Sequence, residues 1–112
     1  MKDDSKKAPI HTRSVVTTRE VREIVARMRE GLPLRCDVTI SRLPASSKYM
    51  AFAHREGRRA KISYVANMTR QEFADAIIHE WAHLHSGDFT HGNKWGKSYA
   101  AAYRAYHDLN YT

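Results

Sequence analysis

The stretch AIIHEWAHLHSGDFTHGNKWGKSYA, from Ala76 to Ala100, determines how this chain is expected to fold. It contains four of the seven histidines, a Glu directly after the first of them, and a Gly-Asn-Lys-Trp run after the last. Upstream, Thr69 and Glu72 form a Thr-x-x-Glu capping box, which predicts a helix with the sequence RQEFADAIIHEWAHLHS. Gly87 is the expected terminator of this helix. The histidine-rich segment therefore begins on a helix and continues beyond its end.

The pentapeptide from His79 to His83 reads H-E-x-x-H. At about 100° per residue its two histidines lie one turn apart on one face, so both imidazoles can bind a single metal ion. The apolar side chains Phe73, Ile77, Trp81 and Leu84 fall on a different face, so the histidines are expected to point away from the core. Glu80 lies beside both histidines, which makes it the candidate general base for a zinc-activated water molecule.

A zinc site of this kind needs a third protein ligand, and three residues downstream are candidates. His85 points away from the first pair while the helix continues. Asp88 follows the expected helix end and can fold back toward the pair. His91 lies beyond a turn and approaches from a different direction, as the distant partner of a near pair commonly does. We therefore expect His79, His83 and His91 to bind one Zn²⁺ per chain, with Asp88 as the alternative third ligand.

The rest of the sequence predicts an α+β domain. TTREVREIVARMREG carries a second capping box, Thr17 with Glu20, and an apolar face, so it predicts a first helix that stops at Gly31. Three alternating segments follow, CDVTISRL, SKYMAFAHR and AKISYVA, which predict a three-stranded antiparallel sheet with a turn at Glu56-Gly57. Large side chains at helical spacing predict a last helix from about Gly92 to about Leu109. We expect a flexible basic arm over residues 1–14 and a single domain over residues 15–112.

Composition restricts the class of protein. A single cysteine among 112 residues forms no internal disulfide. No apolar run resembles a signal peptide or approaches the roughly 20 residues needed to cross a bilayer. These features favour a cytoplasmic protein with no membrane association, and a monomer is expected. The net charge of +7 is compatible with a polyanionic partner such as DNA, and charge alone leaves that question open.

Two further groups of residues have alternative interpretations. Arg55, Arg58, Arg59 and Lys61, together with His54, surround the expected hairpin and could contact phosphates, or they could form a solvated turn. Tyr99 and Tyr103 are one helical turn apart after His91, and a tyrosine hydroxyl near zinc could stabilise an oxyanion in the transition state. Core packing is favoured for Tyr99, and both roles stay open for Tyr103. Trp95 is expected to be a core anchor that holds the turn at His91.

The two-part pattern, His79-Glu80-x-x-His83 and then His91-Gly92-x-x-Trp95 opening a helix, resembles the SprT-like zinc metallopeptidases. The likeness covers roughly Thr17 to Leu109 and includes a strand that reads AKISY. It implies a minimal zincin-like fold, zinc bound by the three histidines, Glu80 as catalytic base and hydrolysis of peptide bonds. The resemblance implies a protein or peptide substrate, and because eukaryotic members clear proteins crosslinked to DNA, the basic charge of this chain is compatible with cleavage of DNA-bound protein.

The chain departs from that family in two ways. The cysteine-rich zinc ribbon of many members is impossible with one cysteine, and the interval from His83 to His91 is short, as in a reduced member encoded by a phage or mobile element. Two other interpretations stay open. One is a regulatory peptidase resembling the repressor-cleaving ImmA family, whose third ligand is usually a downstream carboxylate. The other is a non-catalytic nucleic-acid-binding module in which zinc, closed by a fourth protein ligand such as Asp88 or His85, only joins two helices.

Overall fold

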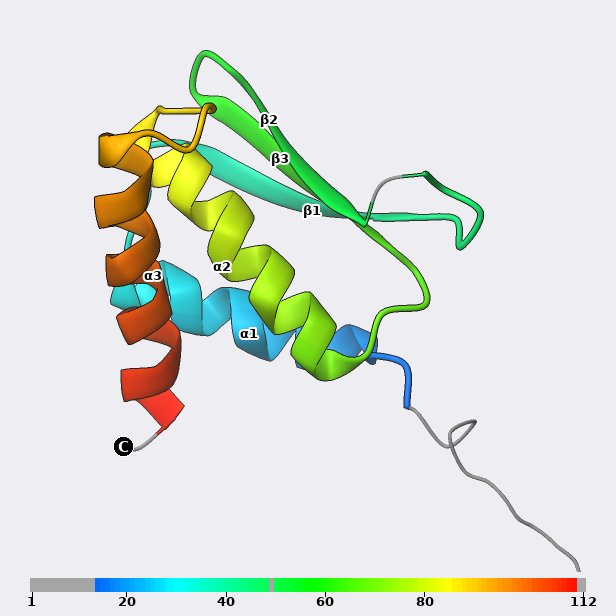
Figure 1. Ribbon diagram of the computed structural model, residues 1–112. Helices are drawn as coiled ribbons and strands as arrows, with labels where there is room; N and C mark the ends of the chain where they lie inside the picture. The colour runs from blue at the N-terminus through cyan, green and yellow to red at the C-terminus, as the bar shows by residue number, and fades with distance from the viewer. Residues whose placement is uncertain (1–13, 49, 111–112) are drawn as a thin grey trace, which may run out of the picture.

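The computed structural model describes residues 14–48 and 50–110, which form three helices and three strands (Figure 1). In chain order the elements are α1 (Thr18–Gly31), β1 (Asp37–Leu43), β2 (Ala51–Glu56), β3 (Arg59–Val65), α2 (Arg70–Ser86) and α3 (Asn93–Asn110). This order confirms the α+β class that the sequence predicts. Apart from Ser14, the predicted arm over residues 1–14 lies outside the described residues.

The sheet is mixed, so the expectation of an antiparallel sheet was wrong. Its strand order is β1-β3-β2, with β3 antiparallel to β2 and parallel to β1. The hairpin at Gly57, whose φ is 61°, joins β2 to β3 as predicted. β3 takes the central position because it is the most buried strand. The connection from β1 to β3 spans residues 44–58 and includes β2, which meets the need for a long crossover between parallel strands.

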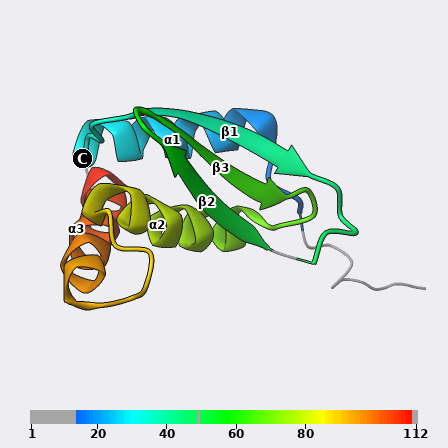
Figure 2. The ribbon, with the colours of Figure 1, turned by 90° about the horizontal axis from the view of Figure 1, so that it is seen from above.

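The sheet lies on one side of the helices, and the core fills the space between them (Figures 1 and 2). In Figure 2, β1 runs along the α1 side of the sheet and β2 along the α2 side. The largest fully buried side chains come mainly from α1, β3 and α2, and they include Ile24, Met28, Ile62, Phe73 and Trp81. Among the described residues, none of the helices combines the length and the apolar character that crossing a membrane requires.

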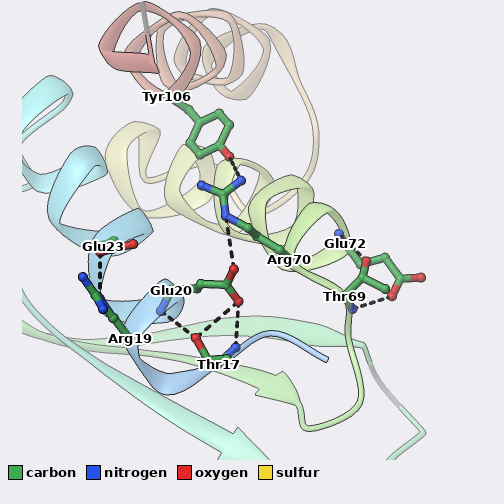
Figure 3. A network of polar contacts seen from close by, with 8 residues as sticks. All are labelled: Thr17, Arg19, Glu20, Glu23, Thr69, Arg70, Glu72 and Tyr106. Carbon is green, nitrogen blue, oxygen red and sulfur yellow. Dashed lines mark hydrogen bonds and ion pairs between the residues drawn. The ribbon is translucent and has the colours of Figure 1, made fainter. Parts of the chain in front are cut away.

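A polar network joins the N-terminal ends of α1 and α2 (Figure 3). Thr17 and Thr69 each accept, at the side-chain oxygen, a hydrogen bond from the backbone N–H of the Glu three residues later. The carboxylate of that Glu accepts in turn from the backbone N–H of the threonine, so both predicted capping boxes form. Arg70 then links the two ends, because its Nε lies 3.7 Å from Glu20 Oε2. Arg70 Nη1 also donates to the Tyr106 hydroxyl of α3 at 3.4 Å. The network fixes how α2 starts, and therefore the rotation of its histidines.

Glycine ends α2 and allows α1 to approach α3. Gly87 adopts the left-handed conformation with φ 72°, and its N–H bonds the carbonyl of His83, which confirms it as the helix terminator. Gly31 lies within α1, and a Cβ built there would meet the Cβ of Ala105 at 2.7 Å. Its role is therefore close packing between two helices as well as the end of α1.

Candidate metal centre

Three histidine side chains converge at the C-terminal end of α2. His79 and His83 lie one turn apart on α2, and His91 comes from the segment that leads into α3 (Figure 1). His79 Nε2 is 3.2 Å from His83 Nε2 and 3.1 Å from His91 Nε2. One ligand atom of each residue lies within 4.8 Å of the others. The structure therefore brings together the three residues that the sequence singles out.

The nitrogens are spaced as a tetrahedral zinc site requires. Ligand nitrogens about 2.1 Å from a tetrahedral ion are about 3.4 Å apart, close to the two distances found here. Three imidazoles are also a suitable donor set for zinc. Burial lowers the pKa of His79 below its usual 6.5, and the proximity of His83 and His91 lowers it further. The ring therefore favours the neutral form, which is the form that binds metals. The residues present fit a zinc ion.

The backbone carbonyl of Asp88 orients the second histidine. His83 is 6% exposed, and its Nδ1 lies 2.8 Å from that carbonyl oxygen. A carbonyl only accepts hydrogen bonds, so Nδ1 is the protonated nitrogen and Nε2 keeps its lone pair toward the cluster. Sequence reasoning considered Asp88 only as a ligand. Its backbone role gives no signal in the sequence, because any residue has a carbonyl.

The carboxylate of Asp88 holds the loop that presents His91. Oδ1 accepts from the backbone N–H of Thr90 at 2.9 Å and from its hydroxyl at 2.6 Å. Oδ2 accepts from the backbone N–H of Trp95 at 3.4 Å. These bonds, led by the Thr90 hydroxyl, lower the pKa of the carboxyl group. The loop ends at His91, which adopts the left-handed conformation with φ 71°, unusual for a residue other than glycine. Asp88 thus supports two histidines and is not a member of the cluster.

Aromatic rings enclose the cluster on one side. The Trp95 ring lies 5.0 Å from His79 and 4.7 Å from His91, and its Nε1 donates to the His79 carbonyl at 3.4 Å. Phe89 stacks on His83 with the centroids 5.4 Å apart. Trp95 is therefore placed against the imidazoles, which corrects the expectation that it anchors the core. Phe89 was missed, because a lone aromatic residue in a loop carries no periodic signal.

Glu80 lies beside the cluster without joining it. Its Oε2 is 3.9 Å from His79 Nε2, and its side chain is 12% exposed. Burial raises the pKa of this carboxyl from 4.5 to about 7, although a hydrogen bond from the Ala53 backbone N–H and the proximity of His91 act in the opposite direction. A carboxyl group with a pKa near neutrality can both accept and release a proton at physiological pH. This position agrees with the predicted role of a general base.

A hollow of about 360 Å³ opens next to His79 and Glu80. Its walls come from Met50 and Ala51, at the start of β2, and from the exposed side of α2, including Ala76. The Val65 N–H bonds the Met50 carbonyl, and the strand register then turns the backbone groups of Ala51 and Ala53 away from β3. The hydrogen bond from Ala53 to Glu80 agrees with this orientation. The outer edge of β2 thus faces the candidate site.

Two of the candidate residues, His85 and Tyr103, lie away from the cluster. His85 Nδ1 is 2.8 Å from the Ser98 hydroxyl of α3, away from the cluster, as its position on the helix predicts. Tyr103 is 48% exposed and contacts Tyr99 and His107. It follows Trp95 by eight residues, about 12 Å along the helix axis. That distance removes Tyr103 as a candidate for stabilising the transition state, whereas Tyr99 packs against the core as expected.

The cations of the hairpin do not form one surface. Strand alternation places Arg59 and Lys61 on the face of the sheet opposite the helices. Arg55 lines a hollow with Leu84 and His85 on the helix side, and its Nε donates to the Gly57 carbonyl. Arg58 lies in the turn. The register also pairs Arg59 with Asp37 on one side and Glu56 on the other, which offsets its charge. The predicted phosphate contact through Arg55, Arg58, Arg59 and Lys61 gains no support from this arrangement.

Comparison with known proteins adds no family. No protein-family model, no curated protein sequence and no solved structure matches the chain. What the site can do is therefore argued from its own geometry.

Proposed function

We propose that this protein is a zinc-dependent endopeptidase. The observation that carries the proposal is the convergence of the His79, His83 and His91 nitrogens, with the Glu80 carboxyl group beside them. Among the described residues, this group of three histidines is the only convergent set of side chains suited to hold a metal ion. A site with three protein ligands is typical of catalytic zinc, because structural zinc is normally closed by four.

The proposed chemistry uses Glu80 as the proton carrier. When bound, zinc supplies a Lewis acid that lowers the pKa of a water molecule to about 7 and polarises the carbonyl under attack. Glu80 accepts the proton of the attacking water at its carboxylate and then donates it to the amine nitrogen of the leaving group. Its burial and its pKa near 7 suit both steps. Trp95 and Phe89 pack against one side of the histidines.

The outer edge of β2 supports an extended polypeptide as the substrate. The backbone of Ala51 turns its N–H and C=O groups outward beside the hollow at His79. A peptide in an extended conformation can pair with such groups and pass over the cluster. Backbone pairing recognises no particular side chain, so we propose a protein or peptide substrate of broad sequence.

The two other candidate functions have less support. A repressor-cleaving peptidase of the ImmA type would use a downstream carboxylate as the third ligand, but the Asp88 carboxylate bonds Thr90 and Trp95. A zinc-stapled binding module would need a fourth protein ligand, but His85 contacts Ser98 on another side of α2. The two-part histidine motif favours a reduced SprT-like peptidase. We include cleavage of DNA-bound protein in this proposal, and its only support is the net charge of +7.

The deciding experiment separates catalysis from metal binding. In Glu80→Gln we expect one equivalent of zinc by elemental analysis and a loss of casein cleavage of about 10²- to 10⁴-fold, because the variant lacks the general base. His85→Gln is the matched control and should keep full activity. Wild-type protein that binds zinc but cleaves no protein, with or without DNA, would contradict the proposal.

The third ligand needs its own test. His91→Ala should lose most of its zinc affinity, because two imidazoles remain where three converge. If His91→Ala keeps its zinc while Asp88→Ala loses it, the ImmA-like alternative is preferred.

A further inference from the structure

A groove runs between α1 and β1, on the side of the molecule away from the histidines. It encloses about 520 Å³. One face of α1 forms one wall, and Ile40 and Arg42 of β1 with Tyr64 of β3 form the other. Val21 and Val25 lie at its floor and are buried, so the bottom of the groove is apolar.

The rim of the groove is positively charged. Arg22 and Arg29 project from α1 and Arg42 projects from β1, and none of the residues lining the groove is acidic. Arg29 donates from Nη2 to the Val38 carbonyl at 2.8 Å. Arg22 and Arg42 form no ion pair with any acid in the part of the chain that the structure describes. An apolar floor between uncompensated guanidinium groups favours a ligand that is apolar on one side and anionic on the other.

The edge of β1 offers backbone groups to the same groove. The Asp37 N–H bonds the Arg58 carbonyl, and the Ala66 N–H bonds the Leu43 carbonyl. In a parallel pair these bonds use alternate residues, so Val38, Ile40 and Arg42 turn their backbone groups away from β3. The bond from Arg29 to the Val38 carbonyl agrees with this orientation. Within residues 14–48 and 50–110, β1 pairs with β3 alone, so its outer edge is open at Ile40 and Arg42, whereas the Val38 carbonyl already accepts from Arg29.

We propose that this groove is a docking site for an extended acidic segment of a partner protein, which adds to the sheet as a strand beside β1. Edge strands bind extended peptides through backbone hydrogen bonds, and pockets for alternate side chains add specificity. Every second side chain of the segment would face the groove, and within that set we expect apolar residues over the floor and acidic residues beside the arginines. The seven residues of β1 set the length of the segment at about seven residues, or roughly 23 Å.

The composition of the groove favours a peptide over a nucleic acid. Single-stranded nucleic acids bind where exposed aromatic rings stack on bases beside a basic track. The aromatic residue lining this groove is Tyr64, which is 6% exposed and packs edge-on against Phe73. Apolar floor residues and unpaired backbone groups are of little use to a phosphate chain, but both match an extended peptide.

This site is independent of the proposed peptidase function. The outer edges of β1 and β2 lie on opposite sides of β3, and the β2 edge is the one on the side of α2, which carries His79 and His83 (Figure 2). A segment bound at β1 therefore leaves the β2 edge free. The groove can be tested in the Glu80→Gln protein, where the probe peptide is not cleaved, and the test is valid whether or not the wild-type protein is an enzyme.

The first test measures binding of a fluorescent eight-residue peptide by anisotropy at low ionic strength. One alternate set of its residues is Glu, Val, Val and Glu, and the other set is Ser, so that acidic and apolar side chains face the groove together. Arg22→Glu/Arg42→Glu should weaken binding by about tenfold, and the matched control Lys97→Glu/Arg104→Glu, which reverses two exposed charges of α3, should change it less than about twofold. Thermal melts by circular dichroism check that each variant is folded. Equal binding of the same peptide with Lys in place of Glu, or a loss of affinity in the control as large as in the groove variant, overturns the proposal.

The second test examines strand pairing itself, which charge reversal alone does not report. A paired peptide uses the N–H groups of alternate residues, so N-methylation of one alternate set should reduce affinity at least about tenfold, while methylation of the other set leaves it nearly unchanged. Equal effects of the two sets overturn the strand-addition proposal. A single-stranded oligonucleotide that displaces the peptide and depends on the same arginines also overturns it, in favour of nucleic acid.

Discussion

The two faces of helix α2 have different roles, because one packs in the core and the other carries the candidate metal centre. On one face Phe73, Ile77, Trp81 and Leu84 are at most 2% exposed and fill the core between the sheet and α1. On the other face, His79 and His83 belong to the candidate metal centre and Glu80 lies beside it. The pKa of Glu80 is raised and that of His79 is lowered. Both faces occur within the same three turns of helix. Periodicity alone separates them, which is why one short segment can hold both the core and the site.

The difference shows where stability comes from. The apolar face gains free energy from burial, roughly 1.5–3 kcal/mol for each large side chain. The polar face places a carboxyl group in a buried position, and its loop holds His91 in a left-handed conformation that is costly for a residue with a side chain. The site is therefore held in position by the core face and by Asp88, and not by favourable interactions of its own.

The largest expected effect is on the core face. Trp81 is fully buried, and its Nε1 donates to the Leu32 carbonyl at 2.8 Å. Trp81→Ala leaves a cavity and an unpaired carbonyl, so we expect the free energy of unfolding to fall by about 3–5 kcal/mol. Urea denaturation of the metal-free protein measures the change. Tyr103→Ala, which truncates an exposed aromatic residue, should lose less than about 1 kcal/mol. Equal losses in the two variants would mean that Trp81 contributes no more than an exposed aromatic residue, which would contradict its place in the core face.

The local elements of the fold could be predicted from the sequence, but the arrangement of the strands could not. Capping boxes at Thr17 and Thr69 and the glycine at position 87 act through nearby backbone groups, so they identify the helices directly. The order β1-β3-β2 places β2 beyond β3 and not beside β1, although β2 follows β1 directly in the chain. Alternation indicates which face of a strand is buried and carries no information about its neighbours.

The same distinction applies to the site. Spacing on a helix predicts His79, His83 and Glu80, because four residues make one turn. His91 was chosen from the chemistry of zinc sites, and the distances to His79 agree with that choice. The supporting contacts of Asp88 and Phe89 depend on the path of the loop after Gly87, and no periodic pattern records that path. For Tyr103 the sequence leaves both roles open, because helical spacing from Tyr99 does not measure the distance to the cluster.

A smaller effect is expected where the loop supports the site face. Asp88→Ala keeps the carbonyl that orients His83 but removes the carboxylate that binds Thr90 and Trp95. The loop should then hold His91 less rigidly, so we expect zinc affinity to fall by about 10- to 100-fold with little change in fold stability. Competition with a chromogenic chelator measures the affinity. Asp75→Ala removes an equal charge from the exposed side of α2 and should leave zinc affinity unchanged; a matching loss there would mean that overall charge, and not the loop, is responsible.

The smallest expected effect is a gain of stability when the buried carboxyl group of the site face is neutralised. The pKa of Glu80 is raised from 4.5 to about 7 in the folded protein. Between those values the folded state keeps a proton that the unfolded state releases, so stability falls as pH rises through this window and stays lower above pH 7. Glu80→Gln removes that penalty in the metal-free protein, and the glutamine oxygen can still accept the Ala53 N–H.

The gain should therefore depend on pH. A shift of this size corresponds to about 3 kcal/mol, which solvent screening of a partly exposed group reduces to about 1–2 kcal/mol. With EDTA present, denaturation should show Glu80→Gln more stable than wild type at pH 8 and equal to it at pH 4. Glu30→Gln, on the exposed surface of α1, is the control and should show no gain. If the stability of Glu80→Gln at pH 8 is also no higher than that of wild type, burial of the Glu80 charge costs no stability. The contrast between the core face and the site face would then be wrong.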